Sequence, residues 1–221
     1  MKTIIIAPHP DDEILGAGGT LLRRKAEGGS LAWLIASEIS IDGGWSKNAI
    51  NKREEEISKI RDLIGFDEVH FLKFSSTKLD LVPMSEMVSA ISQVFEKFKP
   101  NEVLMPHRGD VHTDHQVLFE AVSSATKWFR HAYIDRILCY ETLSETDFGL
   151  APEKSFRPNV FVNIENFLDH KMQAMNIYES EMGNFPFPRS SEAIRGLAAV
   201  RGAASGFRAA EAFELLRERS A

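Results

Sequence analysis

The first residues of the chain place an apolar segment directly before a histidine and three acids. Residues 3–7 read Thr-Ile-Ile-Ile-Ala, and residues 9–13 read His-Pro-Asp-Asp-Glu. A short isoleucine-rich run that ends at prolines is typical of a buried strand in a parallel sheet. In open α/β sheets, ligands bind in the crevice at the carboxyl ends of such strands. We therefore expect the side chains of residues 9–13 to stand at the rim of a crevice.

The rest of the chain alternates between strand-like and helix-like patterns. Further strands are predicted at residues 31–36, 69–74, 102–106, 136–140 and 159–164, and helices at residues 14–26, 48–64, 84–98, 117–129 and 167–181. The last 30 or so residues, rich in Ala and Glu, are predicted to be helices broken near Gly202 and Gly206. The repeated order predicts a single α/β domain over residues 1–221, a Rossmann-like, doubly wound, mostly parallel sheet with helices on both faces.

Charge, cysteine content and hydropathy exclude several classes of protein. A net charge of -6 without a long basic run argues against a nucleic-acid-binding surface. The lone cysteine, Cys139, allows neither an intramolecular disulfide nor a thiolate metal cluster, and its apolar neighbours predict a buried thiol. Because the chain has no signal-peptide pattern and no run of about 18 apolar residues, we expect a soluble cytoplasmic protein without membrane insertion.

A second predicted strand end carries the same residue types as the first. The apolar residues 102–106 precede a polar stretch in which residues 112–115 read His-Thr-Asp-His. Imidazole nitrogen and carboxylate oxygen suit Zn²⁺, and a catalytic zinc ion commonly has three protein ligands and a position for water. We therefore take His9, Asp12 and His115 as candidate metal ligands.

The sequence after the second strand also predicts how His115 is held. Thr113, followed by Gln116 three residues later and then by apolar residues, matches a capping box. His115 would then lie in the first turn of a helix, with its backbone fixed.

Simpler explanations exist for each of these groups. Acids at positions 11–13 are favoured at a helix N-terminus by capping and by the helix dipole. A hydrogen-bonded rim histidine would account for His9, and exposed helix residues would account for His112 and His115. The metal site is favoured because two strand ends, predicted at one sheet edge, both carry His and Asp.

A glycine-rich stretch after the first strand does not fit a dinucleotide-binding loop. Residues 16–19 read Gly-Ala-Gly-Gly, but the third glycine of the G-x-G-x-x-G pattern would fall at Leu21. We expect these small residues to let the first helix lie close to the sheet.

Taken together, the two motifs resemble those of the PIG-L/LmbE-like family of zinc-dependent de-N-acetylases. Residues 7–13 are similar to the family's A-H-P-D-D-E, with Pro8 in addition, and residues 112–115 fit its H-x-D-H. Further matches spread over most of the chain: Arg53–Glu56, Leu63–Gly65, Lys171, Arg201-Gly202 and Ala210–Phe213. The chain has Ser180-Glu181 where members often read Ser-Gln. An LmbE-like α/β fold is implied.

The resemblance implies that the protein removes the acetyl group from an N-acetylated amino sugar or its conjugate, of the N-acetylglucosamine type. It implies Zn²⁺ bound by His9, Asp12 and His115, and Fe²⁺ also suits two histidines and one carboxylate. The implied partner is a small-molecule amino sugar, and family members often form homo-oligomers.

Roles for the remaining residues follow from the same resemblance. Asp11 would take a proton from the attacking water and return it to the leaving amine. His112 would stabilise the oxyanion, with Asp114 orienting and charging it. Arg53 would contact the substrate, although a solvated helix charge explains it equally well. A metal-dependent sugar-phosphate phosphoesterase and a non-catalytic glycan-binding protein of the same fold remain alternatives.

Overall fold

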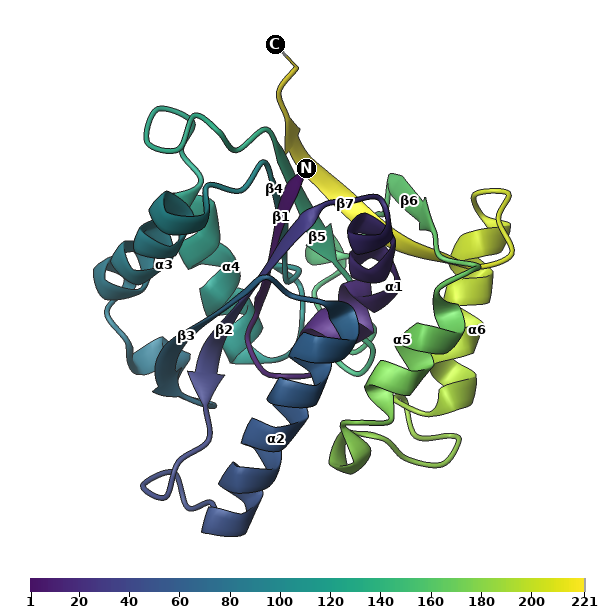
Figure 1. The fold of residues 1–221 in the computed structure, drawn as a ribbon, viewed down its shortest axis with the longest axis horizontal. Coiled ribbons are helices and arrows are strands. Elements are labelled where there is room, and N and C mark those ends of the chain that lie inside the picture. Colours follow the sequence, from purple (N-terminus) through teal and green to yellow (C-terminus); the bar gives the residue numbers. More distant parts are fainter. Residues whose placement is uncertain (221) are drawn as a thin grey trace.

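The computed structural model describes residues 1–220, which form one seven-stranded sheet with helices on both faces (Figure 1). The strands are β1 (Lys2–Ala7), β2 (Ser30–Glu38), β3 (Glu68–Ser75), β4 (Glu102–Met105), β5 (Arg136–Tyr140), β6 (Val160–Asn163) and β7 (Ala210–Glu218). The α-helices are α1 (Asp12–Ala26), α2 (Lys47–Ile64), α3 (Met84–Phe98), α4 (Thr113–Ala125), α5 (Leu168–Met175) and α6 (Ser191–Ala203). Short 3₁₀ helices lie at Leu79–Leu81, Pro152–Lys154 and Glu179–Glu181.

The sheet has the strand order β3-β2-β1-β4-β5-β7-β6. Strands β1 to β5 are parallel to one another, and β7 runs antiparallel to both β5 and β6. The predicted doubly wound, mostly parallel α/β fold is therefore confirmed.

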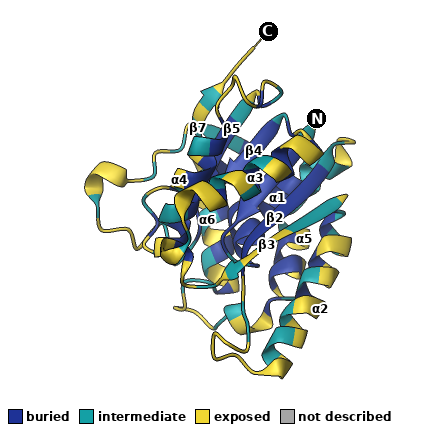
Figure 2. Ribbon diagram, turned by 90° about the vertical axis from the view of Figure 1, so that its left-hand side faces the viewer, coloured by how far each residue is buried: buried dark blue, intermediate teal, exposed yellow. Residues whose placement is uncertain are grey.

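Strand β1 shows why its isoleucines form an unbroken run. Ile4 and Ile6 belong to the core beneath α3 and α4, whereas Ile5 and Ala7 belong to the core beneath α1, α2, α5 and α6. Figure 1 shows α3 and α4 on one face of the sheet and α1, α5 and α6 on the other. Because successive strand residues point to opposite faces, a sheet covered on both sides needs apolar residues at every position. Figure 2 shows the central strands as the most deeply buried part of the fold.

The two predicted motifs meet because β1 and β4 are neighbours. Ile4 of β1 pairs with Ala32 of β2 on one side and with Val103 of β4 on the other. The chain winds outward from β1 in both directions, so a topological switch point lies between β1 and β4. The segments that follow β1 and β4 therefore open onto one crevice, as the sequence predicted.

Helix α1 lies so close to the sheet that side chains larger than hydrogen do not fit at two positions. A Cβ atom on Gly16 would lie 2.2 Å from Cδ2 of Tyr140, and one on Gly19 would lie 2.7 Å from Cγ2 of Ile164. The structure confirms that small residues let this helix approach the sheet.

A buried ion pair from outside α1 makes hydrogen bonds with the backbone of this helix. Lys171 Nζ donates to the Leu15 carbonyl at 2.8 Å and lies 2.7 Å from Oε1 of Glu211. The Glu211 carboxylate accepts from the backbone N–H groups of Gly19 and Thr20, at 2.9 and 2.7 Å. Lys171 belongs to α5 and Glu211 to β7. Two segments from the C-terminal part of the chain therefore hold the helix that begins at Asp12.

Some predicted elements were wrong in type or extent. The last segment forms α6 and then β7, where helices alone were predicted, because pairing with β5 and β6 outweighs the local preference of an Ala- and Glu-rich sequence. The helix predicted at residues 167–181 ends at Met175, and the one predicted at 117–129 spans Thr113–Ala125. Cys139 is buried, as expected. None of the helices within residues 1–220 is long and apolar enough to cross a bilayer.

Candidate active site

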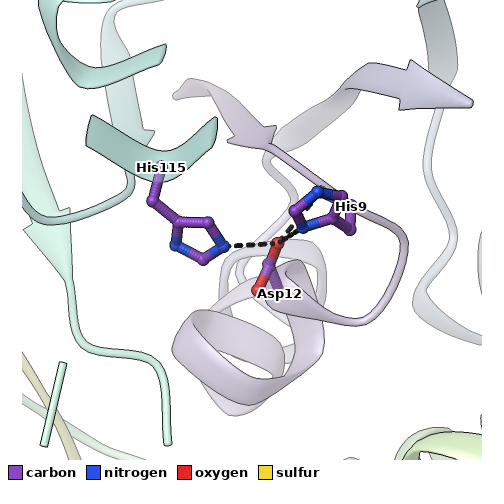
Figure 3. A group of neighbouring side chains, drawn as sticks. All are labelled: His9, Asp12 and His115. Carbon is purple, nitrogen blue, oxygen red and sulfur yellow. Dashed lines mark hydrogen bonds and ion pairs between the residues drawn. The ribbon is translucent and has the colours of Figure 1, made fainter. Parts of the chain in front are cut away.

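The three predicted ligands meet at the crevice (Figure 3). Oδ2 of Asp12 lies 3.5 Å from Nδ1 of His9 and 3.4 Å from Nε2 of His115. Figure 3 shows the two imidazole rings, one after β1 and one on α4, directed at the same carboxylate at the start of α1. Asp12 and His115 are buried, and the His9 side chain is 20% exposed.

The other nitrogen of each ring is held by a second carboxylate. His9 Nε2 lies 3.0 Å from Oδ2 of Asp114, and His115 Nδ1 lies 2.8 Å from Oδ2 of Asp110. A carboxylate behind each imidazole is typical of histidines that bind metal ions, since it fixes the ring and leaves one nitrogen free to coordinate. Sequence reasoning assigned no role to Asp110, and its position five residues before His115 was the available signal.

The donor set fits a zinc ion. Three donor atoms, one from each of His9, Asp12 and His115, lie within 4.8 Å of one another. With metal–ligand distances of about 2.0–2.2 Å, tetrahedral coordination places ligand atoms about 3.3–3.6 Å apart. The separations of 3.4 and 3.5 Å between Asp12 and the two histidines agree with that requirement.

The turn before α1 explains why acids stand at positions 12 and 13. Oδ2 of Asp12 accepts from the His9 N–H at 2.9 Å, and Oε2 of Glu13 accepts from the Asp11 N–H at 2.9 Å. Asp11 itself has φ 137°, a conformation that L-residues seldom adopt. The acids at positions 12 and 13 therefore hold a strained turn in addition to presenting carboxylates, whereas Asp11, the N-cap of α1, makes no side-chain cap hydrogen bond.

Asp11 faces an arginine that sequence reasoning missed. Nη1 of Arg189 donates to Oδ2 of Asp11 at 2.9 Å and lies 3.3 Å from Oε2 of Glu181. Burial and the charges of Asp12 and Glu181 raise the pKa of Asp11 to about 7, although Arg189 and His9 act in the opposite direction. A carboxyl group with a pKa near neutrality is suited to both accepting and returning a proton.

Arg53 lies in the site, where its guanidinium already supports the turn. Nη1 donates to the Pro10 carbonyl at 2.6 Å, Nη2 lies 2.5 Å from Oε1 of Glu181, and Nε lies 3.3 Å from Oε2 of Glu56. The alternative of a solvated helix charge is therefore wrong for this residue. Glu181 contacts both Arg53 and Arg189, so this glutamate has a structural role in the site.

His112 lies beside the other two histidines, and the start of α4 around it differs from the prediction. The N-cap of α4 is His112, whose Nδ1 accepts from the Asp114 N–H at 3.1 Å, so the predicted capping box starting at Thr113 is wrong. Gln116 Nε2 donates instead to the Asp110 carbonyl at 2.7 Å. His115 does lie in the first turn, as predicted.

The Asp114 carboxylate is directed at His9, whereas the resemblance implied that it orients His112. Besides His9, it accepts from the N–H groups of Thr77 and Leu79, at 2.8 and 3.1 Å. The contact of Asp114 with the His112 ring is a hydrogen bond from its backbone N–H, and its carboxylate lies within 4.8 Å of a His112 ring nitrogen.

A cavity of about 760 Å³ opens over these groups. The residues that line it include the three predicted metal ligands, and also His112, Arg53 and Arg189. A cavity of this size, containing titratable groups with shifted pKa values, has the character of an active site.

Comparisons with known proteins extend the resemblance. Residues 4–126 match a family model described as PIG-L, GlcNAc-PI de-N-acetylase. The diacetylchitobiose deacetylase of Thermococcus kodakarensis is 28% identical over 95% of this chain and 81% of the relative. The crystal structure of the conserved protein TT1542 from Thermus thermophilus is also 28% identical, with a TM-score of 0.79 over 99% of this chain and 96% of that one. The N,N′-diacetylchitobiose deacetylase of Pyrococcus horikoshii, solved with an inhibitor, shares the fold with a TM-score of 0.74 at 20% identity, over 98% of this chain and 84% of that one.

Proposed function

This chain belongs to the PIG-L family of GlcNAc-PI de-N-acetylases, and on that premise we propose that it is a metal-dependent amidohydrolase that removes the acetyl group from an N-acetylated amino sugar or its conjugate. The relative from Thermococcus kodakarensis is named for an acetylated amino-sugar substrate. The observation that carries the proposal is the convergence of His9, Asp12 and His115 around one point in the cavity.

His9, Asp12 and His115 would hold the ion, with Zn²⁺ as the proposed metal. A zinc ion in such a site lowers the pKa of water to about 7 and polarises the amide carbonyl. Asp110 and Asp114 hold the two ligand imidazoles from behind, which keeps the donor atoms in place.

Asp11 is the proposed general base and acid. Its carboxylate lines the cavity and is held by Arg189, at the start of the same turn that presents Asp12. It would accept the proton of the attacking water and return it to the nitrogen of the leaving amine. Positioned proton transfer of this kind contributes about 10²–10⁴-fold to the rate.

His112 is the proposed oxyanion donor, and its hydrogen bonding supports that role. Burial and the neighbouring His9 and His115 lower the pKa of His112, which favours the neutral ring. Because Nδ1 accepts a hydrogen bond from the Asp114 N–H, the proton of the neutral ring is on Nε2. The ring lines the cavity, where Nε2–H can donate to the developing oxyanion, and Asp114 would orient the ring through its own backbone N–H, which donates to Nδ1.

Arg53 is the proposed substrate contact. Its guanidinium lines the cavity, and three of the five N–H donors of an arginine suffice for the contacts to Pro10, Glu181 and Glu56. The others would be directed to substrate hydroxyls.

Acetate release is the test of this function. Zinc-loaded protein would be incubated with N-acetylglucosamine, its glycosides and acetylated oligosaccharides, and acetate would be measured by a coupled assay. We expect acetate release that stops on chelation and falls by at least about 10²-fold in Asp11→Asn. The matched control is Asp62→Asn, which changes an exposed acid on α2. Metal-loaded protein that releases no acetate from any compound would refute the proposal, and release of phosphate from sugar phosphates would favour the phosphoesterase.

A further inference from the structure

The cavity has a large apolar side that the proposed chemistry does not use. Six side chains form it, and we call them the apolar wall: Ile39, Ile41, Trp45, Ile50, Ile57 and Phe71. They come from the β2–α2 connection, from α2 and from β3, whereas the proposed ligands follow β1 and β4. Figure 1 shows the β2–α2 connection and the first turns of α2 extending beyond the end of β2.

The spacing along α2 explains why this helix contributes to the wall. Ile50, Arg53, Glu54 and Ile57 all line the cavity. Positions separated by three, four and seven residues share one face of a helix. The same face therefore presents a guanidinium to the polar side of the cavity and two isoleucines to the apolar side.

Several wall side chains remain accessible to water. Ile41 is 61% exposed, Trp45 is 49% exposed and Phe71 is 48% exposed. Ile39, Ile50 and Ile57 are partly buried. Large apolar side chains that gather beside a cavity mark a binding surface, because covering them with an apolar group removes their contact with water.

Size and polarity together restrict the group that this surface would take. A cavity of about 760 Å³ lies in the range that encloses drug-sized ligands, so it has room for a group beyond the amino sugar. A second sugar ring would bury hydroxyl groups against isoleucine side chains that offer no hydrogen bonds, which is unfavourable. Three of the charged side chains that line the same cavity, Glu38, Glu54 and Lys73, are exposed and keep their contact with water.

We propose that the substrate carries a hydrocarbon group that packs on the apolar wall while its N-acyl amino group lies at the metal ligands. This inference rests on the proposed function and narrows its substrate class to hydrophobic conjugates of an N-acylated amino sugar. The hydrocarbon is either an alkyl or aryl group at the anomeric carbon or an N-acyl chain longer than acetyl.

Two series of compounds separate these two sources. The first contains methyl, butyl and hexyl glycosides of N-acetylglucosamine, and the second contains methyl glucosaminides with N-acetyl, N-butanoyl and N-hexanoyl groups. For each we would measure kcat/KM, and for hexyl and methyl glucosaminide, which have no amide, Kd by calorimetry. Affinity and kcat/KM should rise along one series by up to about fourfold per buried methylene.

Two variants test whether the gain in kcat/KM with chain length comes from the apolar wall. Ile41→Ser combined with Trp45→Ser should remove most of the gain with chain length. The matched control is Trp128→Ser, which changes a tryptophan that is 59% exposed and does not line the cavity. The gain with chain length should survive in that control.

The outcomes distinguish failure of this inference from failure of the proposed function. Hydrolysis of the methyl compound with no gain along either series would overturn the inference and leave the deacetylase intact. A gain in calorimetric affinity without any hydrolysis would support the apolar wall and refute the deacetylase. Faster hydrolysis of N,N′-diacetylchitobiose than of both the hexyl glycoside and the N-hexanoyl glucosaminide would also overturn the inference, in favour of a second sugar.

Discussion

Arg189 Nη1 donates to Oδ2 of Asp11 at 2.9 Å, although the two residues are 178 positions apart in the chain. The contact joins the segment after α5 to the turn after β1. It gives the proposed catalytic carboxylate a fixed orientation, which its unusual backbone conformation alone does not provide.

Replacement of Arg189 by methionine should lower kcat/KM for acetate release by about tenfold or more, since hydrogen bonds to charged groups are worth about 1.5–3 kcal/mol. The reason is that Asp11 loses the partner that holds its carboxylate. The matched control is Arg195→Met, because Arg195 pairs with exposed Asp169 on the surface. Unchanged kinetics in Arg189→Met, with normal folding, would contradict this role.

Asp110→Asn should weaken zinc binding by about 10–100-fold, the usual effect of removing a carboxylate behind a ligand histidine. Asp110 fixes His115 through Nδ1, and asparagine keeps the size of the side chain. Competition with a chromophoric chelator measures the affinity, and Asp80→Asn, an exposed change, is the control. Equal affinity in Asp110→Asn and wild type would show that His115 does not depend on this contact.

The Lys171–Glu211 pair should be strongly coupled in folding stability. Lys171→Met alone should lower the free energy of unfolding by about 3–5 kcal/mol, because it leaves Glu211 charged and buried without its partner. The double variant Lys171→Met/Glu211→Leu should lose less than the sum of the two single variants, since the freed groups of α1 can re-form helical hydrogen bonds. Urea denaturation measures all three, and additive losses would argue against an inserted pair.

Gly16→Ala should destabilise the fold by about 1–3 kcal/mol through overpacking against Tyr140. Gly196→Ala in α6 is the matched control, because its Cβ would meet no atom within 4 Å. That change should stabilise the helix by about 0.5–1 kcal/mol. Thermal unfolding that ranks the two variants in the opposite order would contradict the close approach of α1 to the sheet.

The sequence predicted the parts of the site that depend on strand ends. The apolar run of β1 and the similar one of β4 indicated a parallel sheet, and the switch between them brings His9, Asp12 and His115 together. These parts were predictable because the polar residues follow their strands directly, so sheet topology alone decides their position.

The parts that the sequence did not reveal depend on long-range contacts or on side-chain direction. Strand β7 was missed because it forms a strand only through pairing with β5 and β6. Arg189 has no local pattern that would place it beside Asp11. Asp114 follows His112 closely in sequence, but the geometry at the start of α4 turns its carboxylate to His9.

The zinc content of the purified protein, measured by elemental analysis after dialysis against trace zinc, tests the proposed metal site most directly. We predict about one zinc ion per wild-type chain, and a large loss of zinc in both Asp12→Asn and His115→Ala. Asp62→Asn should retain the wild-type content. Two ions per chain, or full zinc content in both ligand variants, would contradict a single ion shared by His9, Asp12 and His115.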